Sequence, residues 1–260
     1  MNHDDISFDP KTGFKSHSQD EKIQKSIDDH CKKYGLEGNE LLTNAFLLMR
    51  RQNLKRFLLH SELFRETLDV PGDIAELGVY RGLGLMTWAN LLECYCIGDR
   101  TKVVHGFDNW EGFTNLSDFD GSEDDSSGKE IGGFNPAEFK AELENAINIF
   151  DSDRFVPWKK RVKLYDGDIC TTVPNFVKEH PGVRFSLIHF DIDLYEPTKV
   201  ALEYFWEKLT RGGIMIFDEY SIPDWPGETQ AVDEFFSDKS DIKIQTSNWT
   251  NTPAAWVIKT

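Results

Sequence analysis

The stretch His189-Phe190-Asp191-Ile192-Asp193-Leu194-Tyr195 decides the fold, because an apolar run stops there abruptly in carboxylates. A strand that is buried on both faces has a continuous hydrophobic sequence, and residues 184–191 fit that description. A second apolar run, Ile214-Met215-Ile216-Phe217-Asp218-Glu219, ends in the same way. Ligands of open α/β sheets bind outside the carboxyl ends of such strands. We therefore expect a sheet with four carboxylates gathered at one edge.

Strands and helices alternate along the chain after the turn at Pro71-Gly72. This alternation predicts an α/β fold with a doubly wound, mostly parallel sheet. We expect strands at 73–78, 102–107, 161–165, 184–191 and 213–218, and helices near 84–97, 136–150, 172–179 and 197–210.

Both ends of the chain depart from this alternation. Residues 20–34 and 39–68 have the apolar period of helices, so we expect an N-terminal helical extension over residues 1–70 and a main domain over 71–260. Near the other end, Ile242–Thr246 and Ala254–Lys259 predict an antiparallel hairpin on one edge of the sheet.

The composition excludes several classes of function. The 260 residues carry a net charge of −16, which argues against binding a nucleic-acid backbone or an anionic membrane surface. The four cysteines form no CxxC pair, the N-terminus has no signal-peptide pattern, and no run of 18 apolar residues occurs. We expect reduced thiols and a cytoplasmic location.

A glycine-rich turn follows the first predicted strand, in the sequence Asp73-Ile74-Ala75-Glu76-Leu77-Gly78-Val79-Tyr80-Arg81-Gly82-Leu83-Gly84. Glycines let a ligand approach the backbone next to a helix N-terminus. The next strand ends in Asp108, where an acid typically receives two ribose hydroxyls. The strand after it leads to Asp168, which either contacts an adenine amino group or caps the following helix. Three strand ends together predict an adenosine-shaped groove.

Two adenosine cofactors fit this groove. Glycines at positions 78, 82 and 84 match the spacing of short-chain dehydrogenases, and Tyr195-Glu196-Pro197-Thr198-Lys199 matches their YxxxK. We expect Pro197 to lie in the first turn of a helix, however, which leaves Tyr195 in the preceding loop. Glu76 suits S-adenosylmethionine (SAM) better, because a carboxylate supports the methionine ammonium group directly or through water.

The two acidic strand ends predict a metal site. In a SAM-type sheet Asp191 and Asp218 end neighbouring strands about 4.8 Å apart, and Glu219 can supply a third oxygen. Oxygen ligands favour Mg²⁺ over zinc. We expect His189 to be a core residue. Asp193 either acts as the general base for a hydroxyl proton or caps the helix that follows.

Two further segments are open to alternative interpretations. Residues 113–135 form a loop rich in Ser, Asp and Gly, which is either a mobile lid or a passive insertion. A basic cluster within residues 50–56 either lines a pocket or forms a solvated helix face, and the second is favoured.

Taken together, these motifs resemble the macrocin O-methyltransferase family, whose members methylate sugar hydroxyls in macrolide and aminocoumarin antibiotics. The matching stretches span roughly residues 40–236 and are 72–82, 107–112, 189–198 and 226–236. The resemblance implies metal ligands at Asp191, Asp218 and Glu219 and a base at Asp193. It implies SAM contacts in the groove, which we assign to Glu76, Leu77, Gly78, Val79, Tyr80, Arg81, Gly82, Asp108 and Asn109, with Asp168 added from the strand-end argument.

The chain departs from the family pattern in two places. The family usually has Asp-Asp where this chain has Asp218-Glu219, and the 113–135 loop is longer and more acidic than usual. The resemblance implies a homo-oligomer and a Mg²⁺- and SAM-dependent O-methyltransferase acting on a hydroxylated small molecule, with a sugar favoured. The alternatives are a methyltransferase with a catechol acceptor, an NAD(P)-dependent dehydrogenase, and a non-catalytic binding module. Trp110, Trp225 or Tyr195 could stack on a catechol ring as well as on a sugar, so the aromatic residues do not decide between these acceptors.

Overall fold

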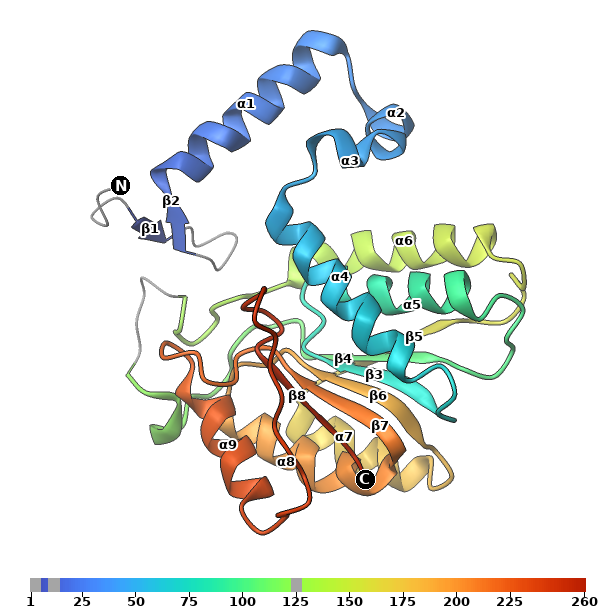
Figure 1. Ribbon diagram of the computed structural model, residues 1–260, viewed down its shortest axis with the longest axis vertical. Helices are drawn as coiled ribbons and strands as arrows, with labels where there is room; N and C mark the ends of the chain where they lie inside the picture. Colours follow the sequence, from blue (N-terminus) through green and yellow to red (C-terminus); the bar gives the residue numbers. More distant parts are fainter. Residues whose placement is uncertain (1–5, 9–14, 123–127) are drawn as a thin grey trace. The chain divides into compact units, whose positions relative to one another are not determined.

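A six-stranded sheet in the order β5-β4-β3-β6-β7-β8 organises the larger of two units (Figure 1). The computed structural model describes residues 6–8, 15–122 and 128–260. The larger unit comprises Arg56–Ser122 and Ile131–Thr260, and the smaller unit comprises Met1–Lys55 and Glu123–Glu130.

The strands of the sheet lie close to the predicted positions. They are β3 (Asp73–Leu77), β4 (Val104–Asp108), β5 (Val162–Asp166), β6 (Phe185–Phe190), β7 (Leu209–Phe217) and β8 (Ala255–Ile258). The first five pair in parallel, and β8 pairs antiparallel with β7. The doubly wound, mostly parallel sheet is therefore confirmed.

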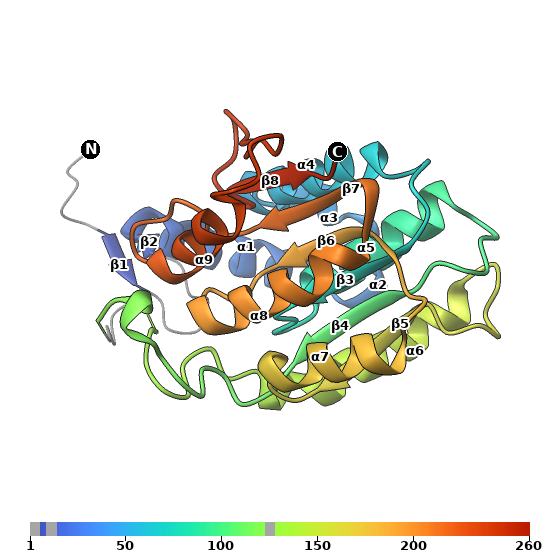
Figure 2. The ribbon, with the colours of Figure 1, turned by 90° about the horizontal axis from the view of Figure 1, so that it is seen from below.

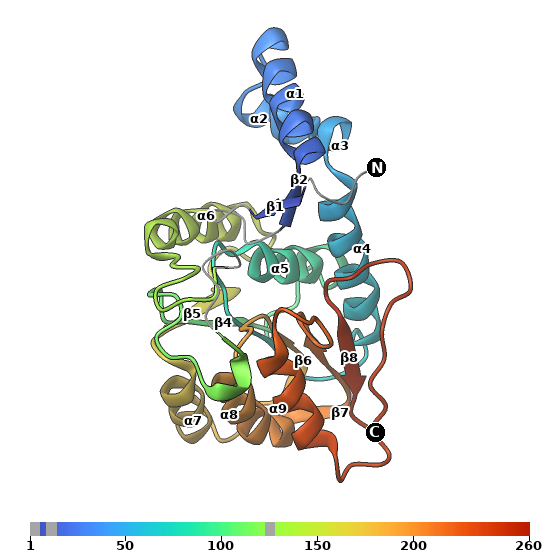
Figure 3. The same cartoon turned by 90° about the vertical axis from the view of Figure 1, so that its left-hand side faces the viewer.

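Helices cover both faces of the sheet (Figures 2 and 3). One face carries α4 (Arg51–Glu66), α5 (Leu83–Tyr95) and α6 (Lys140–Asp153), and the other carries α7 (Ile169–Glu179), α8 (Tyr195–Phe205) and α9 (Pro226–Phe236). Residues 226–236, which form α9, were noted as a matching stretch but were not predicted to be a helix.

The core lies in two layers because side chains of a strand alternate between the faces. On β7, Ile214 and Ile216 pack under the α4–α6 helices, whereas Met215 and Phe217 pack under α7–α9. The same parity puts Glu76, His189 and Asp218 on the α4–α5 face at the carboxyl end of the sheet. The strand pattern thus decides which side chains meet there.

The predicted C-terminal hairpin is only partly formed. Residues 255–258 form β8, but residues 242–246 make a single bridge, in which Gln245 and Trp256 exchange two backbone hydrogen bonds of 2.9 Å. Ile242 and Ile244 pack against the core under α7–α9 instead of extending the ladder. The antiparallel C-terminal pair is confirmed by β7 and β8, whereas the strand predicted over 242–246 is reduced to one bridge.

The smaller unit contains a short β-hairpin pairing and a series of helices. They are β1 (Ile6–Phe8) and β2 (Lys15–His17), which pair antiparallel, α1 (Ser18–Tyr34), α2 (Gly38–Thr43) and α3 (Ala45–Leu48). The single helix predicted over 39–68 is thus broken into α2, α3 and α4. The Asn44 side chain donates to the Glu40 carbonyl at 2.9 Å, and Met49 is extended, so local bonding interrupts the helix.

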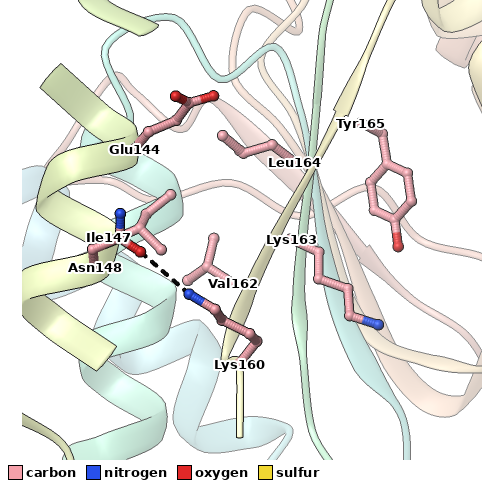
Figure 4. A pocket seen from close by; sticks show the side chains of 8 residues that line it. All are labelled: Glu144, Ile147, Asn148, Lys160, Val162, Lys163, Leu164 and Tyr165. Carbon is pink, nitrogen blue, oxygen red and sulfur yellow. Dashed lines mark hydrogen bonds between the residues drawn. The ribbon is translucent and has the colours of Figure 1, made fainter. Parts of the chain in front are cut away.

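The exposed edge strand β5 borders a hollow at the surface. A hollow of about 480 Å³ opens between α6 and the edge strand β5, where Lys160 donates to Asn148 at 3.2 Å (Figure 4). Its lysines also protect the unpaired edge of β5 from pairing with another chain.

Within residues 6–8, 15–122 and 128–260, no helix combines the length and the apolar character needed to cross a membrane.

Candidate active site

The glycine turn and the acidic strand end touch each other. The Asp191 N–H donates to the Leu77 carbonyl at 2.9 Å, and the Asp218 N–H donates to the Phe190 carbonyl at 3.0 Å. Gly78 has φ +81°, and a Cβ there would overlap the Asp191 carbonyl oxygen. Only glycine fits at this crossing. The predicted adenosine groove and the predicted metal site are therefore two halves of one region.

Strained backbone marks this end of the sheet. Four residues other than glycine have positive φ just beyond strands: Tyr80 after β3, Trp110 after β4, Asp193 after β6 and Ser221 after β7. Such conformations cost on the order of 1–3 kcal/mol each and cluster at functional sites. The strain therefore supports a binding site at the carboxyl ends of the strands.

Asp108 holds the backbone of the glycine turn through hydrogen bonds to its carboxylate. Its carboxylate accepts the N–H groups of Val79 and Tyr80 at 2.8 and 2.9 Å, and its other oxygen accepts the Trp110 N–H at 2.8 Å. Asp108 is 9% exposed. It lies where the ribose contact is predicted, and it fixes the shape of the turn.

The other predicted cofactor residues flank this turn. Asn109 bonds the chain around it, to the Gly112 carbonyl and the Glu111 N–H, both at 2.8 Å. The exposed Arg81 lies over the Phe139 ring at 4.0 Å. Gly82 is the left-handed N-cap of α5. The structure brings these residues together around one turn.

The third strand end has a different arrangement from the one predicted. Asp168 caps α7, because its carboxylate accepts the Cys170 N–H at 2.9 Å, so the capping alternative is confirmed. Asp166, which was not selected from the sequence, ends β5 and contacts the residues that follow β4. It accepts Trp110 Nε1–H at 2.8 Å and the Lys140 ammonium at 2.6 Å.

Glu76 lies beneath the turn and is 1% exposed. Its Oε2 accepts Trp88 Nε1–H at 2.8 Å and faces His189 Nδ1 at 3.1 Å. His189 Nε2 faces Asp218 Oδ1 at 3.2 Å. Burial lowers the pKa of His189, but hydrogen bonds to Asp218 and Glu76 outweigh it and raise this pKa to about 10. Each ring nitrogen of His189 thus faces a carboxylate, an arrangement that favours the charged imidazole, and its predicted place in the core is confirmed.

Carboxylate oxygens gather beyond the ends of β6 and β7. Asp191, Asp193 and Glu219 have ligand atoms within 4.8 Å of one another. Burial and the neighbouring Asp193 carboxylate raise the pKa of Glu219 well above its usual range. Its Oε2 is buried and has no hydrogen-bond partner among the described residues. A cation at this point would satisfy that oxygen and keep the group ionised.

Glu228 of α9 lies behind this cluster and was not predicted. It is fully buried, and its Oε1 accepts the Glu219 N–H at 2.9 Å. Within the described part of the chain its Oε2 also has no partner. Burial and the Asp218 carboxylate raise the pKa of Glu228. The motif at residues 226–229 was the available signal for this residue.

For the basic cluster within residues 50–56, a solvated helix face was favoured over the lining of a pocket, and for Arg56 that preference was wrong. Its guanidinium donates to Asp218 Oδ2 at 2.6 Å and to Asp191 Oδ2 at 2.8 Å. Burial opposes ionisation of Asp218, but Arg56 and His189 outweigh it and hold the pKa of Asp218 well below its usual range. Sequence reasoning missed this contact because helix periodicity does not show which strand end a helix crosses.

A second group of possible ligands is a hydrogen-bond network instead of a metal site. His60, His189 and Asp218 are buried with ligand atoms within 4.8 Å. Both ring nitrogens of His189 face carboxylates, and Arg56 occupies Asp218. Burial and the charge on His189 lower the pKa of His60, which stacks on Trp88 at 4.4 Å. Arg56 and His189 therefore satisfy both oxygens of Asp218 in this structure, and a metal ion would reach Asp218 only by displacing Arg56.

The ends of the 113–135 loop are fastened together. The Phe113 N–H donates to the Gly133 carbonyl at 3.0 Å, and the Gly132 N–H donates to the Phe113 carbonyl at 2.7 Å. Asp120 is 2% exposed and accepts the Tyr195 N–H at 2.7 Å, at the start of α8. Residues 123–127 of the predicted lid lie outside the described residues. The described stem is therefore anchored beside the acidic cluster.

The aromatic residues proposed to stack on an acceptor differ in accessibility. Tyr195 is 3% and Trp110 6% exposed, so both are unavailable, while Trp225 is half-buried. Tyr195 is also the first residue of α8, so placing it in the preceding loop was wrong. Lys199 Nζ reaches its hydroxyl at 3.3 Å, but that hydroxyl donates to Glu234 at 2.6 Å.

Comparison with known proteins identifies the family. The chain matches the family described as Macrocin-O-methyltransferase (TylF) over residues 5–256. The chain belongs to this family. A solved relative, the calicheamicin methyltransferase CalS11, has 29% identity and a TM-score of 0.85, with 96% of each chain covered. The O-methyltransferase NovP shares the fold. It has 22% identity and a TM-score of 0.60, with 79% of this chain and 80% of that one covered. Membership of the macrocin family removes the basis for the dehydrogenase interpretation.

Curated relatives of this macrocin-family chain include two named enzymes. The mycinamicin III 3''-O-methyltransferase of Micromonospora griseorubida is 29% identical over 155 residues, which is 59% of this chain and 57% of that protein. A tetracenomycin-C rhamnosyl 4'-O-methyltransferase of Streptomyces olivaceus is 30% identical over 157 residues, 59% of this chain and 54% of that protein. The alignments therefore span little more than half of each relative.

Proposed function

We propose that this protein transfers a methyl group from SAM to a hydroxyl group of a sugar or sugar-like small molecule, with Mg²⁺ bound at the acidic strand ends. The observation that carries the proposal is the cluster of Asp191, Asp193 and Glu219 oxygens directly beside the Gly78 turn. Family membership and the named activities of the relatives support the same chemistry. Asp193 and the glycine turn are then parts of one active site.

The donor set fits Mg²⁺. Every predicted ligand is a carboxylate oxygen, as hard cations prefer, and one buried oxygen of Glu219 lacks a partner among the described residues. We propose that Asp191, Asp218 and Glu219 would hold the ion, although Asp193 lies close enough to Asp191 and Glu219 to compete for that role. Mg²⁺, when bound, supplies positive charge that lowers the pKa of an acceptor hydroxyl.

The remaining chemistry belongs to the chain. Asp193 accepts the hydroxyl proton at its carboxylate, and its backbone at φ +62° turns the side chain out of the strand line. Asp108 and the glycine turn bind the nucleoside part of SAM, whose sulfonium provides an electrophilic methyl group. Holding the two reactants in line is the main contribution of such a site. A catechol acceptor is the alternative, since vicinal oxygens on either ring suit one cation.

Calorimetry with SAM and with NADPH, each with and without Mg²⁺, tests this function. We expect SAM to bind, with NADPH giving no heat. SAM binding in the absence of NADPH binding also separates a methyltransferase from a dehydrogenase. Binding of NADPH without SAM would reject the proposal, and SAM binding without turnover on any acceptor would favour a non-catalytic module.

The anchored loop leads to a separate prediction about the acceptor. Asp120→Ala removes the carboxylate that accepts the Ser117 N–H and the Tyr195 N–H, both at 2.7 Å. We expect the KM for the acceptor to rise about tenfold, because one buried charged hydrogen-bond set is worth roughly 1.5–3 kcal/mol, while the Kd for SAM stays within twofold. Steady-state kinetics measure both. Asp118→Ala, at an exposed neighbour on the same turn, is the matched control, and an equal effect of both variants would contradict the anchoring role.

The resemblance also implies a homo-oligomer, which we retain as a proposal. Light scattering on the purified chain measures its mass directly. A mass of a single chain at micromolar concentration would contradict it.

A further inference from the structure

The strongest unexplained feature of the site is the bridge that Arg56 makes between two strand ends. One guanidinium nitrogen lies 2.6 Å from Asp218 Oδ2, and the other lies 2.8 Å from Asp191 Oδ2. The side chain of Arg56 is 19% exposed, and that of Asp218 is 3% exposed. A planar guanidinium holds two carboxylates in a fixed geometry. Arg56 thus occupies the two carboxylates that end β6 and β7.

Both oxygens of Asp218 have partners. Oδ2 is held by Arg56, and Oδ1 faces His189 Nε2 at 3.2 Å. His189 is fully buried and is held from its other side by Glu76 at 3.1 Å. It has no room to withdraw. Arg56, on a helix and partly exposed, is therefore the partner that can leave Asp218.

The charges around Arg56 explain why a cation sits here. The carboxylates of Asp218, Asp191 and Glu219 act on Arg56, and Asp193 and Glu228 add further negative charge around Glu219. A buried carboxylate needs a paired cation, because removing one partner from such a pair leaves an uncompensated charge. Arg56 supplies that compensation from α4. A divalent cation at the same carboxylates would supply it equally well, and two cations in contact repel each other.

We propose that Arg56 is an internal counter-ion that competes with the divalent cation for Asp218 and Asp191. The inference rests on the proposed function, since it concerns the same strand ends. Mg²⁺ bound by the Oδ2 atoms of Asp191 and Asp218 would displace the guanidinium from both carboxylates. Because such coupling is reciprocal, Mg²⁺ weakens the hold of Asp218 on α4, and α4 weakens the binding of Mg²⁺.

The test measures Mg²⁺ binding directly, with the metal alone as the probe. Calorimetry is performed on the wild type, Arg56→Gln, Arg56→Lys and Arg51→Gln. Arg51 lies on the same helix and is exposed, so its variant controls for the loss of one positive charge. We expect Arg56→Gln to bind Mg²⁺ at least tenfold more tightly, Arg56→Lys to fall between it and the wild type because ammonium is a point donor, and Arg51→Gln to stay within twofold.

Two further readouts separate competition from a general charge effect. Without metal, Arg56→Gln has a Tm several degrees below the wild type, and Mg²⁺ raises its Tm more than that of the wild type. In the wild type, Mg²⁺ accelerates hydrogen exchange in peptides covering residues 56–66. Arg56→Lys, which keeps the charge, allows the comparison if Arg56→Gln folds poorly.

The outcomes distinguish this inference from the proposed function. Mg²⁺ binding by the wild type, with equal or weaker binding by Arg56→Gln, would overturn the competition and leave the metal site in place. Mg²⁺ binding by no variant would overturn both. Unchanged exchange in residues 56–66 on adding Mg²⁺ would also overturn the displacement of Arg56.

Discussion

Asp193→Asn is expected to retain SAM and Mg²⁺ binding while methyl transfer falls about 10²–10⁴-fold, the usual contribution of a general base. An amide keeps the shape of the side chain but accepts no proton at neutral pH. Asp193 suits the role because it lies beyond β6, where positive φ turns it away from the strand. Calorimetry measures the two affinities, and single-turnover kinetics measure transfer.

The same variant decides between two roles for Asp193. Its carboxylate lies with those of Asp191 and Glu219, so it is also placed to bind the metal. If Asp193→Asn lost Mg²⁺ binding, the residue would be a ligand, and if it kept full activity it would be neither ligand nor base. Asp69→Asn, an equivalent change at an exposed position, should leave binding and transfer unchanged.

Gly78→Ala is expected to disrupt both halves of the site. Gly78 has φ +81°, and an added Cβ would overlap the backbone carbonyl of Asp191, which cannot rotate away. Left-handed strain and overpacking together lower the free energy of unfolding by about 3 kcal/mol or more. For a domain of this size that corresponds to a fall in Tm of about 6–12 °C. We also expect the Kd for SAM to rise at least tenfold, because the turn itself moves.

Gly182→Ala is the matched control for this substitution. Gly182 is exposed, has an ordinary φ, and a Cβ there would meet nothing within 4 Å. We expect its Tm and its Kd for SAM to equal those of the wild type within error. Thermal denaturation and calorimetry measure both variants, and a wild-type Kd for SAM in Gly78→Ala would show that the turn does not form the cofactor site.

Much of the fold was predictable because its determinants are local. Apolar runs ending in carboxylates identified β6 and β7, and their side-by-side pairing follows from the parallel order. The Gly78 turn and Asp108 were also found from spacing alone. Residues 242–246 have a strand-like pattern but form only one bridge to β8, with Ile242 and Ile244 partly buried against the core.

The parts of the site that were missed depend on contacts distant in the sequence. Arg56 lies 162 residues from Asp218, and nothing in its helix indicates which strand end it reaches. Glu228 is hidden for the same reason, since it approaches Glu219 from α9. Asp166 and Asp168 are two residues apart, and the point where β5 ends and α7 begins decides that Asp166 contacts Trp110 while Asp168 caps the helix. Local sequence patterns predicted the strand ends, whereas the helices that contact those ends could be identified only from the structure.

We propose that the protein carries out a Mg²⁺-dependent methyl transfer from SAM to a sugar hydroxyl. CalS11, the solved relative described above, is named as a TDP-rhamnose 3'-O-methyltransferase, so TDP-rhamnose is a suitable first compound to test. The most direct measurement is mass spectrometry of a reaction containing the purified protein, SAM and TDP-rhamnose, with Mg²⁺ or with a chelator. We predict a singly methylated sugar nucleotide and S-adenosylhomocysteine in equal amounts with Mg²⁺, and neither with the chelator. Equal methylation in both reactions would contradict the metal-dependent mechanism, and NADPH binding without SAM binding would contradict the account as a whole.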